Sequence, residues 1–425
     1  MKNPKLVPIV LTVIIAVLAI AIIFILIFMK NQPIERRGMA PLVEITAMEP
    51  DSSKWGLNFP NQYSTLLLTK DNNTPTTFGG SEQKDKLEVD PRLKILFAGY
   101  SFSKEYDEDR GHWNSLIDVR KTKRLTEKTA GTCYSCKSSN NPSLWAEMGM
   151  AEYDSLKFTE LTSKITEPIG CANCHEANTM RLIVTNPALE EALSAQGLDW
   201  TKFTRQEMRT VVCANCHVEY YFQKDTNYLT LPWENGTRIE NIINYYDEQG
   251  HADWTHPDSG TAIIKMQHPD YELFSADSTH FKAGVACADC HMPYTRDGAV
   301  KFSNHNVMSP LLRPAETCGA CHTNVDYVVE RVNIIQAQVW KTMEGSENAI
   351  VDAINAINTA ASDPNANMGL IEDARVLHRH AQARWDFIAA ENSMGFHNPS
   401  EALRILADAT DLARQAQLKA WQAVK

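Results

Sequence analysis

The chain has 425 residues, of which 44% are hydrophobic, enough for one large globular domain or two ordinary ones. Its formal net charge of −11 argues against nucleic acid as a partner, because phosphate binding needs a basic face. An anionic substrate would need a local positive path.

The first predicted element is a membrane-spanning helix. Residues 6–29 carry no charge, and at about 1.5 Å per residue they would extend about 36 Å, beyond the roughly 30 Å of a hydrocarbon core. A cleavable signal peptide has a shorter apolar stretch and then a small-x-small site, whereas KNQPIERRG follows here. We therefore expect an uncleaved signal-anchor over residues 1–30, rather than a removed signal, and a linker over 31–45.

Residues 46–327 hold all ten cysteines, in five C-x-x-C pairs. Four pairs are followed at once by histidine and the first by Lys137. Structural zinc is the main alternative, but zinc sites usually bring two such pairs within about 15–20 residues of each other, and these lie farther apart. C-x-x-C-H is the pattern of covalent c-type haem attachment. The attachment positions are Cys133, Cys136, Lys137, Cys171, Cys174, His175, Cys213, Cys216, His217, Cys287, Cys290, His291, Cys318, Cys321 and His322.

The chain changes character after these motifs. Residues 328–425 place apolar residues at helical spacing, with helix-start signals at Ser346 and Ser400. This pattern predicts three or four long helices, which either cover the haem region as a lid or form a self-association surface. The expected fold class is mainly α, a multihaem cytochrome c fold with five closely packed haems, little β structure and long C-terminal helices. Bacteria attach haem covalently outside the cytoplasm, so we expect an anchored protein on the periplasmic side of the cytoplasmic membrane.

Lys137 stands where the other motifs have an imidazole. An amine binds iron only when deprotonated, and the free side chain has a pKa near about 10.4. We interpret Lys137 as the ligand of a catalytic iron with an open position opposite. The alternative is a non-enzymatic electron-transfer protein in which every iron has two protein ligands. Spacing alone does not choose such ligands among the remaining histidines.

Three further stretches carry a resemblance to a known family. They are FAGYSFSKEYDEDRGHWNSLIDVRKTKR (97–124), CANCHVEYYF (213–222) and IIKMQHPDYELF (263–274). With one C-x-x-C-K followed by four C-x-x-C-H, residues 90–425 resemble the pentahaem, ammonia-forming cytochrome c nitrite reductases. The resemblance implies six-electron reduction of nitrite to ammonium at the Lys137 haem, with electrons relayed through four bis-histidine haems. A reductase of another small oxide, such as hydroxylamine, nitric oxide or sulfite, is the nearer alternative.

The same resemblance implies the residues of the site. Arg124, or Arg120 as the alternative, would orient the anion, Tyr220 would donate a hydrogen bond or proton, and His268 would relay protons. Calcium would bind side-chain oxygens of Glu219 and Gln267 and the carbonyls of Tyr220 and Lys265. The second ligands would be His305, His112, His397 and His280 for the second, third, fourth and fifth haems. The implied partners are a multihaem cytochrome or quinol dehydrogenase as electron donor and, through the long helices, a second copy.

Overall fold

The computed structural model describes residues 14–24, 41–108 and 110–424. It divides into two compact units, Met1–Glu44 and Ile45–Lys425. In the first unit, residues 14–24 are helical and expose apolar side chains, while the rest of the predicted anchor and most of the linker lie outside the described residues. Within the described ranges no helix is both long and apolar enough to cross a membrane. The signal-anchor over residues 1–30 stays a prediction.

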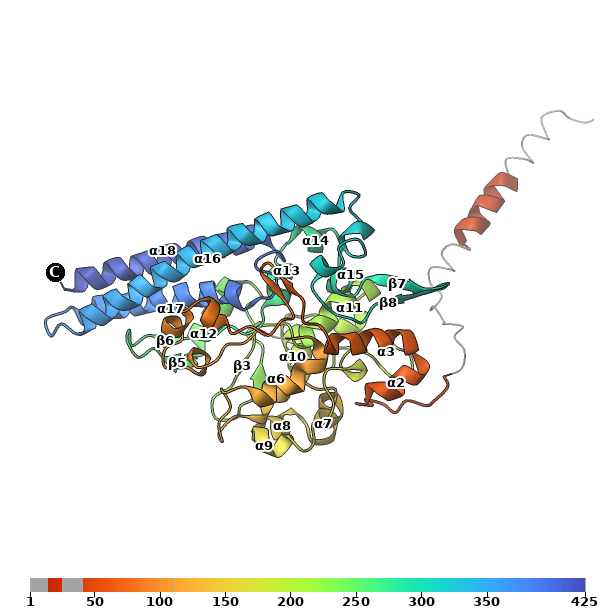
Figure 1. The fold of residues 1–425 in the computed structure, drawn as a ribbon, viewed down its shortest axis with the longest axis horizontal. Coiled ribbons are helices and arrows are strands. Elements are labelled where there is room, and N and C mark those ends of the chain that lie inside the picture. Colours follow the sequence, from red (N-terminus) through yellow and green to blue (C-terminus); the bar gives the residue numbers. More distant parts are fainter. Residues whose placement is uncertain (1–13, 25–40, 109, 425) are drawn as a thin grey trace, which may run out of the picture. The chain divides into compact units, whose positions relative to one another are not determined.

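The unit Ile45–Lys425 is mainly helical, which confirms the predicted fold class (Figure 1). Up to the fourth C-x-x-C motif its helices are short and separated by turns. These helices are α2 (Ser52–Asn58), α3 (Pro60–Leu67), α4 (Lys86–Val89), α5 (Leu93–Leu96), α6 (Ser115–Lys121), α7 (Asn141–Met148), α8 (Met150–Ser155), α9 (Phe158–Leu161), α10 (Pro187–Ala195), α11 (Arg205–Val211), α12 (Ile239–Glu248), α13 (Asp270–Ser275), α14 (Thr279–Lys282) and α15 (Cys287–His291). Local caps start several of them; α11 follows Thr204, which forms a reciprocal capping box with Glu207.

Strands in the described residues form four two-stranded antiparallel ribbons. The ribbons pair β1 (Pro75–Thr76) with β2 (Gly79–Gly80), β3 (Tyr221–Phe222) with β4 (Leu229–Thr230), β5 (Trp254–Thr255) with β6 (Ala262–Ile263), and β7 (Tyr294–Asp297) with β8 (Val300–Ser303). Strands this short fasten loops and do not build a sheet. Because β3 begins directly after Tyr220 and β6 ends shortly before Lys265, two ribbons adjoin predicted site residues.

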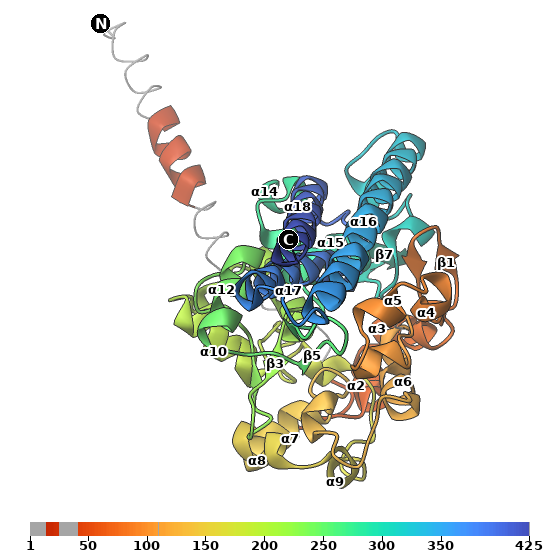
Figure 2. The same cartoon turned by 90° about the vertical axis from the view of Figure 1, so that its left-hand side faces the viewer.

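Three long helices follow the last C-x-x-C motif: α16 (Val325–Ala361), α17 (Met368–Ala390) and α18 (Pro399–Ala423). They pack together at one side of the short-helix region (Figures 1 and 2). Asn324, Asn367 and Asn398 cap their N-termini, and Ser400 lies in the first turn of α18, as predicted. A buried alanine stripe on α18 lets the helices approach closely. The stripe contains Ala402, Ala409, Ala413, Ala416 and Ala420.

The helix start predicted at Ser346 is wrong, because α16 continues unbroken through this residue. Ser346 is fully buried, and its hydroxyl donates to the carbonyl of Leu406 on α18 at 3.0 Å. It also lies 2.8 Å from the hydroxyl of Thr410, on the same helix. Packing against α18 thus satisfies a side chain that would favour a cap in an isolated segment.

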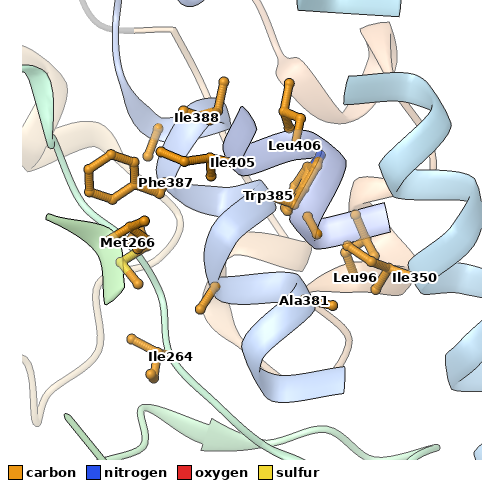
Figure 3. Close-up of a cluster of buried hydrophobic side chains, with 14 of the residues drawn as sticks. Leu96, Ile264, Met266, Ile350, Ala381, Trp385, Phe387, Ile388, Ile405 and Leu406 are labelled. Atoms are coloured by element: carbon orange, nitrogen blue, oxygen red, sulfur yellow. The ribbon is translucent and has the colours of Figure 1, made fainter. Parts of the chain in front are cut away.

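The largest apolar core joins this bundle to the segment that carries several predicted site residues. Figure 3 shows Ile264 and Met266 beside α17, with Trp385 and Phe387 in the same cluster. All four side chains are at most 2% exposed. Burial of Ile264 and Met266 fixes the course of the chain into residues 267–268.

Candidate functional site

Each C-x-x-C motif begins in a short helical turn, and its second cysteine lies within that turn or at most two residues after its end. These turns are η4 (Gly131–Tyr134), η5 (Cys171–Asn173), η7 (Val212–Asn215), helix α15 and η9 (Cys318–Ala320). In three of them the backbone N–H of the following histidine donates to the carbonyl of the first cysteine, at 2.8–3.0 Å. The turn therefore presents two sulfurs and one imidazole together, as covalent haem attachment requires.

The motifs also lie next to one another. Cys136 of the first motif lies beside Cys216 of the third, and Cys213 of the third lies beside Cys287 of the fourth. In the second motif, Asn173 donates its side-chain N–H to the backbone just after the first motif, at 2.9 Å. The third motif thus adjoins both the first and the fourth, the close spacing expected of packed haems.

The eight histidines predicted to bind iron in pairs come together in the expected pairs. Their ring centroids are 6.3 to 6.5 Å apart. The pairs are His175 with His305, His112 with His217, His291 with His397, and His280 with His322. Each pair joins a motif histidine to one from a distant part of the chain.

This spacing fits an iron ion between the rings. A metal–imidazole bond is about 2 Å long and the ring centroid lies about 1 Å behind the nitrogen, so two such ligands put their centroids about 6 Å apart. His268 also lies 6.3 Å from His217. Spacing alone therefore does not choose between His112 and His268 as the partner of His217, and that choice rests on the sequence resemblance.

The imidazoles are also oriented for metal binding. In four of them Nδ1 faces a protein acceptor, at 2.8 to 3.2 Å. The acceptors are the carbonyl of Met180 for His175, the carbonyl of Met308 for His291, the carbonyl of Ser303 for His305, and the carboxylate of Asp270 for His217. Because these groups only accept, Nδ1 carries the proton and Nε2 is the atom suited to a metal.

Of the other histidines, His256 and His378 form a buried pair whose centroids are 5.9 Å apart. His256 donates from Nε2 to the carbonyl of Ile95 at 2.8 Å. His378 lies 2.9 Å from the hydroxyl of Thr261 and 3.0 Å from the amide oxygen of Gln382. Hydrogen bonds within the protein therefore engage both rings, in agreement with their exclusion from the predicted ligands.

Tyr220 lies beside the first motif. Burial raises the pKa of Tyr220 well above its usual range, and the nearby thiols of Cys136 and Cys133 add to this effect. Glu219 acts in the same direction, while the charge of Arg124 favours the phenolate. The phenol is therefore protonated and able to donate a hydrogen bond throughout the physiological pH range.

The two candidate arginines have different surroundings. Arg120 donates to the hydroxyl of Tyr134 at 3.1 Å and to two backbone carbonyls of residues 162–165, at 3.2 and 2.6 Å. Arg124 lies over the ring of Phe102, with its central carbon 4.1 Å from the ring centroid, and donates from Nε to the hydroxyl of Thr122 at 3.1 Å. Three hydrogen bonds to protein groups occupy the guanidinium of Arg120. The guanidinium of Arg124, stacked on an apolar ring, has more N–H groups with which to bind an anion.

His268 is the last residue of the segment that begins at Ile264. Its carbonyl accepts from the backbone N–H of Asp270 at 2.7 Å, at the start of α13. Upstream, the buried ammonium of Lys265 donates to Asp386 on α17 at 2.9 Å. The other carboxylate oxygen of Asp386 accepts from the backbone N–H of Met266 at 2.8 Å. Asp386 of α17 thus fixes the backbone just before His268 through these two contacts, which together form a clamp on the segment.

Three predicted calcium ligands meet beside this clamp. A carboxylate oxygen of Glu219 accepts from the backbone N–H of Gln267 at 2.5 Å. The side-chain amide of Gln267 lies 3.3 Å from the carbonyl of Lys265. Tyr220, whose carbonyl is the fourth predicted ligand, follows Glu219 directly in the chain. The structure therefore gathers hard oxygen donors next to Tyr220.

A second acid, Glu272, lies behind Glu219 and was not predicted. The backbone N–H of Glu219 donates to its Oε1 at 2.8 Å. Burial raises the pKa of Glu219 well above its usual range and the pKa of Glu272 to about 8. Within the described part of the chain, Oε2 of Glu272 is buried without a hydrogen-bond partner. Two desolvated carboxyls fit a nearby divalent cation, which would favour their ionised forms.

Sequence reasoning also missed Asp270, Glu391 and Asp386. Asp270 and Glu272 follow His268 within four residues, so their position beside a predicted catalytic residue was a usable signal. Glu391 and Asp386 lie more than a hundred residues further along the chain and no local pattern marks them.

Comparison with known proteins accounts for this arrangement. A family model described as cytochrome c552 matches residues 51–425. Cytochrome c-552 from Parabacteroides distasonis is 42% identical over 384 residues, covering 88% of this chain and 77% of that protein. Cytochrome c-552 from Bacteroides fragilis is 39% identical, covering 94% and 84%.

Among solved structures, a cytochrome c nitrite reductase from Desulfovibrio desulfuricans, whose catalytic subunit has two calcium sites, superposes with a TM-score of 0.85. It is 33% identical, and the match covers 88% of this chain and 87% of that one. A cytochrome c family accounts for the C-x-x-C pairs as covalent haem sites. The chain therefore belongs to the cytochrome c552 family.

Proposed function

We propose that the chain is an ammonia-forming cytochrome c nitrite reductase, with its active site at the first C-x-x-C motif. The observation that carries the proposal is that Arg124 and Tyr220 lie within electrostatic range of the thiols of the one motif that ends in lysine, Lys137. The haem at Cys133 and Cys136 would supply electrons and a coordination position for the nitrogen of nitrite. The similarity to a solved nitrite reductase gives independent support.

The side chains divide the remaining work. Arg124 presents two parallel N–H groups to the nitrite oxygens and offsets the negative charge of the substrate. Tyr220 holds its proton at the phenol oxygen and donates to a nitrite oxygen as the N–O bond breaks. His268 is assigned the proton relay, because an imidazole is the side chain whose unperturbed pKa lies closest to neutral pH.

The reaction needs a supply of protons as well as electrons. One nitrite takes up six electrons and eight protons, and yields one ammonium ion and two water molecules. Each released water carries away an oxygen that must be protonated, so donors have to be reloaded repeatedly from solvent. Tyr220 and His268 lie on neighbouring segments and would share this task, with the phenol donating and the imidazole relaying protons to it.

Electrons would reach the first motif through the four histidine pairs. We number the haems by motif order. The thiol contacts between the first and third motifs and between the third and fourth support a path through haems 4 and 3 to haem 1. The second motif is joined to the first by Asn173, which gives the relay a second neighbour of the active site.

Calcium would bind at Glu219, Gln267 and the carbonyls of Tyr220 and Lys265. The raised pKa values of Glu219 and Glu272 support this, because burial without a cation disfavours their ionised forms. The ion would fix the relative positions of Tyr220 and His268. It would also add positive potential that attracts nitrite to an acidic protein. The solved relative has two calcium sites in its catalytic subunit.

The partners follow from the same proposal. A multihaem cytochrome or membrane quinol dehydrogenase would deliver electrons on the periplasmic side. Two copies would associate through the long helices, where α17 exposes Val376 and α18 exposes Leu418 and Trp421, each 49–52% accessible. Analytical ultracentrifugation tests this association, with Trp421→Glu expected to weaken the dimer.

Electron paramagnetic resonance of the resting protein tests the proposed function. We expect one high-spin haem among low-spin haems, and a change in the high-spin signal when nitrite is added. Only low-spin signals would show that every iron has two protein ligands, and the chain would then be an electron carrier. In steady-state assays, turnover of nitrite should be faster than turnover of hydroxylamine or sulfite. A faster rate with sulfite would mean that sulfite is the main substrate.

A further inference from the structure

A single buried carboxylate lies between ligands of two different haems. Asp270 Oδ2 is 3.2 Å from Nδ1 of His217, the motif histidine of haem 3. Its other oxygen, Oδ1, is 3.4 Å from Nδ1 of His397, the second ligand of haem 4; within the described residues this nitrogen has no hydrogen-bond partner, so the carboxylate acts on it through its charge. Asn392 holds the carboxylate in place by donating from its backbone N–H at 2.8 Å and from its side chain at 2.9 Å. Asp270 itself is 7% exposed.

The ligands of the other haems have different partners. His175 and His305 of haem 2 and His291 of haem 4 place Nδ1 against neutral backbone carbonyls. A carboxylate attracts the Nδ1 proton more strongly than a carbonyl does, which makes Nε2 a more basic ligand. A more basic ligand stabilises ferric over ferrous iron and so lowers the reduction potential.

His397 has a second acidic neighbour. Nδ1 of His397 is 3.2 Å from Glu391, whose side chain is fully buried. Glu391 is held in turn by the backbone N–H and hydroxyl of Ser393, at 2.8 and 2.6 Å. Haem 4 therefore has two carboxylates near one ligand, whereas Asp270 is the carboxylate at the Nδ1 of His217 on haem 3.

We propose that Asp270 is a redox-tuning residue shared by haems 3 and 4, and that it lowers both reduction potentials together. The proposal rests on the ligand pairs assigned under the proposed function. The third motif adjoins the first, so a lower potential on haems 3 and 4 makes them stronger donors toward the Lys137 haem. One fixed charge thereby acts on both haem 3, whose motif adjoins the first, and haem 4, whose motif adjoins the third.

Potentiometric titration of the holoprotein, followed by electron paramagnetic resonance, tests the proposal. Asp270→Asn should raise the midpoint potentials of two haems, and Glu391→Gln should raise the potential of haem 4 alone. Asn392→Ala removes a donor that competes for Asp270 and should lower both potentials. Asp247→Asn is the matched control, because it removes the same charge beside His380, which is not an assigned ligand; all five potentials should stay unchanged.

The outcomes separate the possible failures. If the low-spin signals of haems 3 and 4 are present in the wild type and Asp270→Asn leaves both potentials unchanged, the shared role of Asp270 is wrong while the proposed function stands. If Asp270→Asn raises the midpoint potential of only one haem, Asp270 is the partner of a single haem and the shared role is wrong. If Asp270→Asn fails to incorporate five haems, Asn392→Ala decides, and unchanged potentials in that variant also overturn the proposal.

Discussion

Lys265 and Asp386 form a fully enclosed ion pair, with the ammonium nitrogen 2.9 Å from the carboxylate and both side chains at most 1% exposed. Burial raises the pKa of Asp386, while the charge of Lys265 opposes that shift. The rings of Phe97 and Phe102 lie 5.2 and 5.0 Å from the ammonium and enclose it further. This pair is the point where the long-helix bundle holds the segment that ends at the predicted catalytic histidine.

Breaking one side of this pair should destabilise the protein strongly. Asp386→Asn leaves a buried ammonium without its counter-charge, and such losses cost about 3–5 kcal/mol. The double variant Lys265→Met with Asp386→Asn removes both charges and keeps an acceptor for the backbone N–H of Met266, so it should recover most of that loss. Chemical denaturation of the three proteins measures the difference; a double variant no better than Asp386→Asn would contradict the argument.

The pocket arginine can be identified by comparing two lysine substitutions. Arg124→Lys keeps the charge but loses the planar fork, and a charge-assisted hydrogen bond is worth about 1.5–3 kcal/mol, so KM for nitrite should rise roughly tenfold to a hundredfold. Arg120→Lys removes contacts with Tyr134 and the carbonyls of residues 162–165 and should lower the thermal midpoint with KM unchanged. The reverse pattern in steady-state kinetics would assign the role to Arg120.

Lys137 can be tested by restoring the histidine of the other motifs. Lys137→His retains both thiols of the motif, so five haems should still be attached, but nitrite turnover should fall sharply because the catalytic iron has lost its amine ligand. The control, Lys128→His, changes an exposed lysine in the preceding loop and should leave turnover unchanged. Haem content by absorbance and ammonium production are the measurements. Unchanged turnover in Lys137→His would mean that the lysine has no special role.

Local pattern predicted the haem attachment residues because the chemistry itself requires consecutive positions on one helical turn. The helical class and the long C-terminal helices were equally accessible, since apolar periodicity survives without tertiary information. Ser346 marks the limit: its hydroxyl belongs to a contact with Leu406 and Thr410, which no local rule encodes. The histidine pairs became predictable only through resemblance to a family.

The carboxylates around the site were the least predictable part. Asp386 reaches Lys265 and Met266 across more than a hundred residues, and isolated acids in helical segments usually face solvent. Glu391 contacts Ser393 and His397 nearby in the chain, but no local pattern shows that its side chain is buried. Asp270 and Glu272 are adjacent to a recognised motif, yet their roles depend on which donors the fold brings to them. Whether such an acid is buried, and which donors it meets, depends on tertiary packing and cannot be predicted from the local sequence.

Calcium should stabilise the protein through Glu219. If the ion binds the folded state, added calcium raises the thermal midpoint, and removal by a chelator lowers it together with nitrite turnover while haem content stays constant. Glu219→Gln should abolish the calcium response. Glu248→Gln is the control, because Glu248 is a surface acid bonded to Asn235. If the thermal midpoint of the wild type does not change with calcium, the proposed calcium site is wrong.

Glu347 should make the stability of the long-helix bundle depend on pH. This side chain of α16 is 1% exposed and accepts from the indole N–H of Trp385 at 3.1 Å. Burial raises the pKa of Glu347 to about 9, the neighbouring carboxyl of Asp90 adds to the shift, and the guanidinium of Arg92 opposes it. Between the ordinary pKa near 4.5 and a pKa of about 9, the folded protein holds a proton that the unfolded chain has released. Stability contributed by the protonated carboxyl is therefore complete below about pH 4.5 and declines as the pH rises toward 9.

The variant Glu347→Gln mimics the protonated acid at every pH and should remove this decline. Its thermal midpoint, followed by circular dichroism, should match the wild type near pH 5 and exceed it near pH 9. Glu344→Gln serves as the control, because Glu344 lies one turn earlier on α16, is 42% exposed and is 3.5 Å from Arg92, so its removal should not flatten the pH profile. Parallel profiles for Glu347→Gln and the wild type would show that Glu347 is ionised in the folded protein and that the ion pair with Arg92, at 2.7 Å, outweighs burial.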